Sequence, residues 1–507
     1  MPELNLQPAV DEMDLPIADG ESWWGGAVAD APLMPFADGH TRDLGSWAGT
    51  NQSSPLLLSD RGRVLWSEHP FAFSFAGGRL RAHGTGLQLG RAGTTLREAF
   101  LAASQQWFPP SGQAPARQMF SGPQYNTWIQ MPYLPDQEQV LAYVRRLLDE
   151  GLPPGVVMID DHWSGDYGEW TFDRSRFADP EAMTAQLHAW GCSVMLWLVP
   201  WVSPDSAAFR DLEARGLLVL DAEGEPAVRR WWNGFSALLD ASNPAAVQWL
   251  TQRLDALQQL GVDGFKFDGG DLEDYRADDH RTHHPVQQVQ AWAEVGLRYP
   301  FNEYRACWRM GGQPLAQRLC DKPPSWGPDG LAGLIAGMVA QGLIGLPFGC
   351  PDLVGGGEIN AVAAAEIDQE FIVRYTQVAA LMPMIQFSRS PAEVLDEEHL
   401  TAVAAAIAAR ERLLPTILEL VDEAARTGEP IVRAMAYHAP DLARLTDQFF
   451  LGPDIVVAPV LQRGATERTA VLPDGDWCGD DGMVVTGPAV LTTAVDLARL
   501  PHYQRVR

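Results

Sequence analysis

The chain has 507 residues, with 65 acidic and 37 basic side chains and a formal net charge of −28. This acid excess, without any stripe of Lys and Arg, argues against nucleic acid as a partner, because it would repel a phosphate backbone. The first residues lack the basic and apolar parts of a signal peptide, and no apolar run reaches the ~18 residues that span a bilayer. We therefore expect a soluble, cytoplasmic protein with no membrane partner.

Residues 1–118 are predicted to form an antiparallel β domain. Their sequence is rich in Gly and Pro, and turn signals separate short apolar runs, as in PLLLSDRGRVLWSEHPFAFSF from Pro55. Alternating segments bounded by turns are typical of strands and hairpins.

Residues 119–415 are predicted to form a (β/α)8 barrel. Short apolar stretches, each ending in a polar or acidic residue, alternate with longer stretches of helical period. The predicted strands span 125–130, 156–161, 193–201, 264–268 and 342–352. The predicted helices span 135–151, 179–191, 243–261, 286–298, 329–341 and 368–382. No GxGxxG follows the first strand and no Walker loop appears, so the repeated pattern favours a barrel over an open doubly wound sheet.

Residues 416–507 are predicted to form a small C-terminal β domain. We expect the helices to end near Arg412. Strand character resumes with DQFFLGPDIVVAPVLQRGATERTAVLPDGDW from Asp447. The five cysteines of the chain are odd in number, far apart and without a CxxC pair, so neither a disulfide framework nor a zinc site is indicated.

Two acids are candidate catalytic residues because active sites of such barrels lie where the strands end. Asp268 follows the strand GFKF and precedes two glycines, which would leave room for a ligand. Asp321 lies in the Pro-rich loop of QRLCDKPPSW. Taken singly, each acid could instead cap a helix or stabilise a turn. As a pair, they could hydrolyse a glycosidic bond, one attacking and one protonating, if ~5–5.5 Å separates them.

Three further charged residues are candidates for substrate binding. Lys266 precedes Asp268 by two residues, so on a strand both side chains point to one face, where the cation would favour ionised Asp268. An ion pair inside the barrel is the alternative for Lys266. Asp160 and Asp161 end another strand, and because neighbours alternate in direction, we expect only one of them to face the centre of the mouth.

Aromatic rings near these acids also indicate carbohydrate, since flat rings cover the C–H faces of sugars. The chain has 18 tryptophans. Those at predicted strand ends or in the following loops are Trp163, Trp197, Trp201, Trp231, Trp232, Trp308 and Trp326. Any single one is more often a core residue, but seven in such positions are hard to assign wholly to packing.

These motifs together resemble glycoside hydrolase family 31, retaining α-glycosidases built on a (β/α)8 barrel with an N-terminal β-sandwich and a C-terminal β domain. GFKFDGGD is similar to the nucleophile motif, which implies that role for Asp268. RACWRMGGQPLAQRLCDKPPSW is similar to the acid/base region, which implies a substrate-binding role for Arg305 and the acid/base role for Asp321. Trp326, which follows that acid, is also expected to bind substrate, and Trp197 and Trp231 are expected to form walls of the pocket.

Two departures from the common pattern bear on the substrate. The α-glucosidases of the family carry a W-x-D-M-N-E nucleophile motif, whereas KFDGGD resembles the branch of myogenesis-regulating glycosidase and its bacterial relatives, which includes α-galactosidase activity. A late P-x-x-R-x-H motif, whose histidine contacts the sugar in glucosidases, is PMIQFS here, with Gln386 and Ser388 at those places.

The resemblance therefore implies an exo-acting retaining α-glycosidase that needs no cofactor or metal and acts on α-galactoside-like oligosaccharides or other α-glycosides. Alternatives in the same family are an α-glucosidase, an α-xylosidase or a sulfoquinovosidase, the last with Arg309 or Arg389 as candidates to bind the sulfonate. A catalytically silent sugar-binding or scaffold protein is the alternative outside the enzymes. The sequence does not decide whether the protein forms a homo-oligomer in which a neighbouring subunit completes the pocket.

Overall fold

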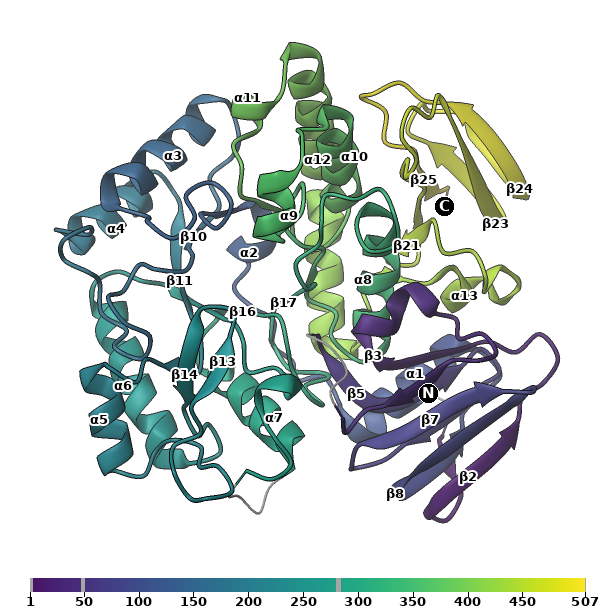
Figure 1. Ribbon diagram of the computed structural model, residues 1–507. Helices are drawn as coiled ribbons and strands as arrows, with labels where there is room; N and C mark the ends of the chain where they lie inside the picture. Colours follow the sequence, from purple (N-terminus) through teal and green to yellow (C-terminus); the bar gives the residue numbers. More distant parts are fainter. Residues whose placement is uncertain (1–2, 47–50, 280–283, 507) are drawn as a thin grey trace.

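The structure is a computed structural model that describes residues 3–46, 51–279 and 284–506 (Figure 1). At its centre, eight parallel strands of the described ranges follow one another around a barrel. They are β9 (Gln124–Asn126), β10 (Val156–Ile159), β11 (Ser193–Leu198), β15 (Gly264–Phe267), β16 (Phe301–Tyr304), β17 (Gln317–Arg318), β18 (Gly349–Cys350) and β19 (Gln386–Phe387). β19 pairs with β9, and a parallel bridge between Leu353 and Gln386 closes the ring beside β18. The predicted (β/α)8 barrel is confirmed.

Helices cover the outside of this barrel, and all six predicted helices are present. They are α3 (Gln137–Asp149), α4 (Pro180–Ala189), α6 (Pro244–Gln259), α7 (Pro285–Val295), α8 (Leu334–Leu343) and α10 (Gln369–Ala380). Local capping explains where they begin: the Asp136 side chain accepts from Gln139 N before α3, and Asn243 accepts from Ala245 N before α6. α8 begins later than predicted because residues 331–333 form a separate 3-10 turn.

The N-terminal domain consists of antiparallel strands that share the long strand β8 (Arg79–Arg91). The other strands are β1 (Asn5–Leu6), β2 (Val10–Pro16), β3 (Trp23–Ala27), β4 (Thr41–Asp43), β5 (Ser53–Ser59), β6 (Arg63–Trp66) and β7 (Phe71–Ala76). The first half of β8 pairs with β7 and its second half with β6, so the sheet folds over on itself. Trp23 and Phe75 meet between the two halves with ring centroids 6.5 Å apart. This is the expected N-terminal β domain, with a sandwich-like core.

The C-terminal domain is a six-stranded antiparallel sheet in the order β20-β21-β22-β25-β23-β24. Its strands are β20 (Val432–Arg433), β21 (Phe449–Leu451), β22 (Ile455–Val457), β23 (Glu467–Gly479), β24 (Val484–Ala494) and β25 (His502–Arg505). In Figure 1 both β domains lie on the side of the barrel that carries α8 and α12 (Glu397–Thr427). Among the described residues, no helix combines the length and the apolarity that crossing a bilayer requires.

The expectation that helices end near Arg412 is wrong. α12 continues through Pro415 to Thr427, where Gly428 ends it in the left-handed conformation with φ 77°. Ile417, Leu418, Leu420, Val421 and Ala424 keep the helical period and are buried. Burial of this apolar stripe compensates for the hydrogen bond that the proline removes.

The remaining elements join or extend these three parts. They are α1 (Leu96–Trp107), α2 (Gln118–Ser121), α5 (Ala207–Ala214), α9 (Ile359–Ala364), α11 (Pro391–Val394) and α13 (Met435–His438). After β11 the chain inserts a small antiparallel sheet of β12 (Trp201–Val202), β13 (Arg229–Trp231) and β14 (Gly234–Leu238). Because Trp231 pairs with Gly234, residues 232 and 233 form the tip of the β13–β14 hairpin. That tip reaches the mouth of the barrel, as the contacts below show.

Candidate active site

A polar cavity of about 250 Å³ lies at the C-terminal end of the barrel strands. Seven of the nine predicted site residues line it: Asp160, Asp161, Trp197, Lys266, Asp268, Arg305 and Asp321. They come from the ends of β10, β11, β15, β16 and β17, which the closed sheet brings to one rim. The other lining residues are Trp128, Tyr133, Trp232, Glu358, Ile359 and Asn360.

Asp268 follows β15 directly and has donors on both carboxylate oxygens. Its Oδ1 accepts from Arg305 Nε at 2.8 Å and from Gly269 N at 2.9 Å, and its Oδ2 accepts from Trp197 Nε1 at 2.8 Å. Lys266 Nζ lies 3.6 Å from Oδ2. Burial alone would raise the pKa of Asp268, but the charges of Arg305 and Lys266 outweigh it and hold the pKa well below its usual range. Asp268 is therefore an ionised carboxylate at neutral pH.

Lys266 and Asp268 lie two residues apart and face the same interior, as the strand period predicts. Lys266 Nζ donates to Asp160 Oδ2 at 2.8 Å, and both side chains are buried. Burial opposes the ammonium charge, but the carboxylates of Asp160 and Asp268 prevail and raise the pKa of Lys266. The two alternatives for Lys266 are therefore compatible: it forms an ion pair inside the barrel, and its charge stabilises ionised Asp268.

Asp160 and Asp161 both line the cavity, so the expectation that only one of them faces the mouth is wrong. The strand ends at Ile159, and beyond it the alternation of side chains no longer applies. Asp161 accepts from Asn233 Nδ2 at 2.6 Å and from the Tyr167 hydroxyl at 3.1 Å. Burial and then the Asp160 charge raise the pKa of Asp161 to about 7.

Arg305 links the nucleophile candidate to a second buried acid. Its Nη2 lies 3.1 Å from Asp271 Oδ2, and its guanidinium lies 5.5 Å from the ring centroid of Trp232. Burial raises the pKa of Asp271 to about 6, although the charge of Arg305 opposes that shift. Arg305 therefore neutralises two carboxylates while its outer face meets an aromatic ring.

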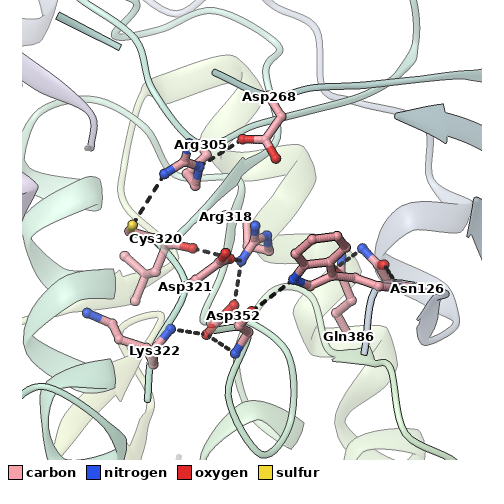
Figure 2. Close-up of polar contacts among 12 residues, drawn as sticks. Asn126, Asp268, Arg305, Arg318, Cys320, Asp321, Lys322, Asp352 and Gln386 are labelled. Carbon is pink, nitrogen blue, oxygen red and sulfur yellow. Dashed lines mark hydrogen bonds and ion pairs between the residues drawn. The ribbon is translucent and has the colours of Figure 1, made fainter. Parts of the chain in front are cut away.

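Asp321 contacts a different arginine from Asp268 (Figure 2). Its Oδ1 accepts from Arg318 Nη1 at 2.7 Å, and 32% of its side chain is exposed. Arg318, the last residue of β17, also pairs with buried Asp352, which follows β18. The structure thus places two carboxylates on one cavity, one buried and strongly ionised and the other partly open.

Two residues predicted to bind substrate, Trp231 as a wall of the pocket and Trp326 after the acid/base, do not line the cavity. Trp231 stacks on Trp201 with ring centroids 5.4 Å apart, and its indole donates to Ser236 Oγ. Its neighbour Trp232 lines the cavity instead, because it occupies the hairpin tip. Trp326 packs against Phe371 and donates to Asp368 Oδ2 at 3.1 Å.

The sequence interpretation also missed residues that only the folded chain brings to the site. Tyr133 lies in the loop after the predicted strand 125–130, whereas Glu358 and Asn360 lie at the start of helix α9, which the sequence interpretation did not include. Asp352 did carry a signal, since it ends the predicted strand 342–352 just as Asp268 ends 264–268. Arg318 carried none, because a two-residue strand has no measurable period.

Comparison with known proteins agrees with this geometry. Residues 119–420 match the glycosyl hydrolases family 31 TIM-barrel domain, and residues 428–506 match the glycosyl hydrolase family 31 C-terminal domain. The chain belongs to glycosyl hydrolase family 31. The resemblance noted in the sequence is confirmed, including its nearest branch, because the myogenesis-regulating glycosidase of Mus musculus is 32% identical over 419 residues.

Two further family 31 proteins have lower identity to this chain than the mouse protein. The sulfoquinovosidase of Agrobacterium fabrum is 27% identical over 341 residues. A dextranase of Flavobacterium johnsoniae superposes with a TM-score of 0.86 at 17% identity, over 98% of this chain and 67% of that one, which shows the shared fold. The match to the mouse protein covers 79% of this chain but 58% of that relative, and the match to the sulfoquinovosidase covers 61% and 50%. The chain thus spans 50–58% of the length of these two curated relatives.

Proposed function

We propose that this family 31 protein is an exo-acting retaining α-glycosidase. Asp268 attacks the anomeric carbon while protonated Asp321 gives its proton to the glycosidic oxygen, so the C1–O bond breaks and a β-glycosyl ester forms on Asp268. In the second step Asp321, now a carboxylate, takes a proton from water. The resulting hydroxide oxygen bonds to C1, the ester bond breaks, and a sugar of retained α configuration leaves.

The observation that carries this proposal is the contrast between the two carboxylates. Asp268 has Arg305, Lys266 and Trp197 around it, and its pKa is held low, as an attacking carboxylate requires. Asp321 is more exposed and touches one cation, Arg318. A pair of carboxyls in such different environments is the pattern that separates a nucleophile from an acid/base.

The size of the cavity supports exo action. Its volume of about 250 Å³ is slightly below the ~300–1,000 Å³ range typical of sites for drug-sized ligands. Such a space suits one sugar ring, held between the ring of Trp232 and the carboxylates of Asp160 and Asp161.

Two features favour an α-galactoside-like substrate over an α-glucoside. The nucleophile motif KFDGGD resembles the branch that includes α-galactosidase activity. In addition, the histidine that contacts the sugar in glucosidases has no counterpart: Gln386 is buried and bonded to Glu303, and Ser388 Oγ accepts from the backbone of Ile129. Neither Gln386 nor Ser388 lines the cavity.

A sulfoquinovoside is less well supported. A sulfonate needs an available cation, but Arg309 is held by Glu68, and Arg389 lines a separate apolar cavity, where it donates to Val362 O. The two cations among the described lining residues, Lys266 and Arg305, are both paired with carboxylates.

The decisive experiment compares kcat/KM for aryl α-galactoside, α-glucoside, α-xyloside and α-sulfoquinovoside with the purified chain. We expect the galactoside to lead by about 100-fold, because a site that hydrogen-bonds particular hydroxyls discriminates strongly, and NMR to show the α-anomer as the first product. Asp268→Ala is the control and should abolish turnover. A leading rate on another sugar would overturn the substrate assignment, and a β-anomer would overturn retention. Calorimetric sugar binding without turnover would instead favour the silent sugar-binding protein.

A further inference from the structure

We propose that Arg318 and Asp352 are positioning residues for Asp321. The guanidinium of Arg318 binds the carboxylates of both Asp321 and Asp352, and the competition from Asp352 lets Asp321 carry and release its proton. This inference rests on the proposed function of Asp321 as the acid/base. Neither residue lines the cavity, so both act through Asp321.

The shared contact is direct. Nη1 of Arg318 donates to Asp321 Oδ1 at 2.7 Å and to Asp352 Oδ1, as Figure 2 shows. Nε of the same guanidinium lies 3.4 Å from Glu303 Oε1. One cation therefore faces three carboxyl groups. Because its charge is divided among them, Arg318 stabilises the Asp321 carboxylate less than an arginine paired with Asp321 alone would.

Asp352 is held in place by its surroundings and by its own backbone. It is fully buried, and its Oδ2 accepts from Lys322 N at 2.8 Å and from Gly357 N at 3.1 Å. Its φ is 91°, a conformation that costs a non-glycine residue of order 1–3 kcal/mol. Strain of this kind persists where the surrounding structure enforces it, and here it aims the carboxylate at Arg318.

Gly357 allows the two carboxylates to approach each other. A Cβ at this position would lie 2.8 Å from Asp321 Oδ1 and 2.8 Å from Asp352 Oδ1. Its carbonyl accepts from Trp128 Nε1 at 3.0 Å, which fixes the loop against the cavity wall. Any larger residue at 357 would push apart the atoms that share Arg318.

The chemistry of the acid/base explains why a shared cation is useful. A guanidinium paired only with Asp321 would favour its carboxylate form and oppose proton donation in the first step. Without any cation, the carboxylate left after that step would be unsupported. Sharing with Asp352 gives an intermediate stabilisation that suits both steps. The proton moves only between Asp321, the glycosidic oxygen and water, and no atom of Arg318 or Asp352 is exchanged.

Electrostatics around Asp352 is consistent with such sharing. Burial raises the pKa of Asp352 to about 7, against the charge of Arg318 and with that of Asp321 adding to the rise. The other titratable and charged groups that face this pair are Glu303 on β16, Lys266 on β15, Asp268 after it, Cys350 on β18 and Tyr375 on α10. Above this pH the Asp352 carboxylate competes fully for the guanidinium.

The test compares substrates that do and do not need a proton. At pH 7 and above, where Asp352 is largely ionised, Asp352→Asn removes the competing charge and keeps the shape. We expect kcat/KM for a 2,4-dinitrophenyl glycoside to stay within about 3-fold of wild type, and that for a phenyl glycoside to fall about 10- to 100-fold, part of the 10²–10⁴ that acid catalysis supplies. The alkaline limb of the pH profile should move to lower pH. Equal losses on both substrates, with an unmoved limb, would mean a merely structural role and overturn the inference.

Two further variants test whether the selective loss depends on the contact of Arg318 with both carboxylates. Asp240→Asn alters another buried carboxylate, bonded to Ser242 and Gln288 outside the cavity, and should leave the ratio of the two rates unchanged. Gly357→Ala should reproduce the selective loss on the phenyl glycoside, because it separates the two carboxylates without changing a charge. If Gly357→Ala leaves that ratio at the wild-type value, the contact of Arg318 with both carboxylates does not control the acid/base, and the inference is overturned.

Failure of the proposed function would look different, as wild type would then turn over neither substrate. The pair is still testable by thermal unfolding, because a carboxyl whose folded pKa lies near 7 lowers stability as pH rises from about 4 to 7. The Tm of Asp352→Asn relative to wild type should therefore rise over that window, and less so in an Asp321→Asn background. A pH dependence that Asp321→Asn leaves unchanged would overturn the sharing of Arg318.

Discussion

Replacement of Arg305 by glutamine tests whether the ionised state of Asp268 depends on its nearest cation. Glutamine can keep a donor near Asp268 Oδ1 but removes a charge whose Nε lies 2.8 Å away. At an effective dielectric constant of about 20, unit charges ~3–4 Å apart interact by about 4–6 kcal/mol, equivalent to roughly 3–4 pKa units at 1.36 kcal/mol each. Lys266 remains, 3.6 Å from Oδ2, and we therefore expect the lower end of that range.

The direction of the expected change in the pKa of Asp268 follows from two opposing effects, burial and the nearby cations. In the wild type, Arg305 and Lys266 overcome burial and keep the pKa of Asp268 low, so Asp268 imposes no acid limb above pH 4. Without Arg305, burial gains weight and the protonated form persists to higher pH. The acid limb of the kcat/KM profile should then lie about 3 pH units higher in Arg305→Gln than in the wild type, with about tenfold loss per pH unit below it.

The assay is kcat/KM for an activated aryl α-glycoside between pH 3 and 9, with the enzyme's fold checked by circular dichroism at each pH. Loss should be greatest at low pH and smallest near pH 8, where Asp268 is ionised in both proteins. Arg309→Gln, a cation outside the cavity, is the matched control and should keep the wild-type profile. A rate reduced by one constant factor at every pH would refute the electrostatic argument and leave Arg305 as a substrate ligand only.

Three other predictions concern single groups of the site. Asp321→Ala should lose activity on poor leaving groups but respond to added azide with an activated substrate, giving an α-glycosyl azide by NMR; a β-azide would contradict retention. Trp197→Phe keeps an aromatic ring but removes the donor 2.8 Å from Asp268, so kcat/KM should fall roughly 10- to 150-fold, the equivalent of 1.5–3 kcal/mol for a charged hydrogen bond. A loss below threefold would show that this bond is dispensable. Asp161→Asn should raise Tm relative to wild type increasingly from about pH 4 to 7, because the pKa of Asp161 near 7 makes its ionisation destabilising over that window. Asp166→Asn, exposed in the same loop, is its control, and a constant Tm difference would disprove the shift.

The order of strands and helices was predictable because its signals are local. Apolar period, N-caps and terminal glycines act within a few residues, and the structure reproduces all six predicted helices. Strands β17, β18 and β19 have two residues each, too few to show any period. The barrel had to be inferred from its longer units, and the closing contact between Leu353 and Gln386 was not visible in sequence.

The chemistry-bearing acids were likewise readable, since Asp160, Asp161 and Asp268 stand where predicted strands end. Their partners were not. Arg318 and Asp352 are 34 positions apart and meet only because β17 and β18 are adjacent. Trp232, and not the predicted Trp231, lines the cavity because it occupies the tip of the β13–β14 hairpin. The pairing register of the two strands decides which residue lies at that tip.

By itself, then, the amino-acid sequence indicated the kind of fold, the family and seven of the residues that line the cavity, because periodicity, caps and strand-end motifs are short-range properties. The tertiary structure decided which of those residues share charges, which are buried and which aromatic ring meets the cavity. Burial and charge proximity are properties of neighbours in space, and these set the low pKa of Asp268 and the raised values of Asp161 and Asp352.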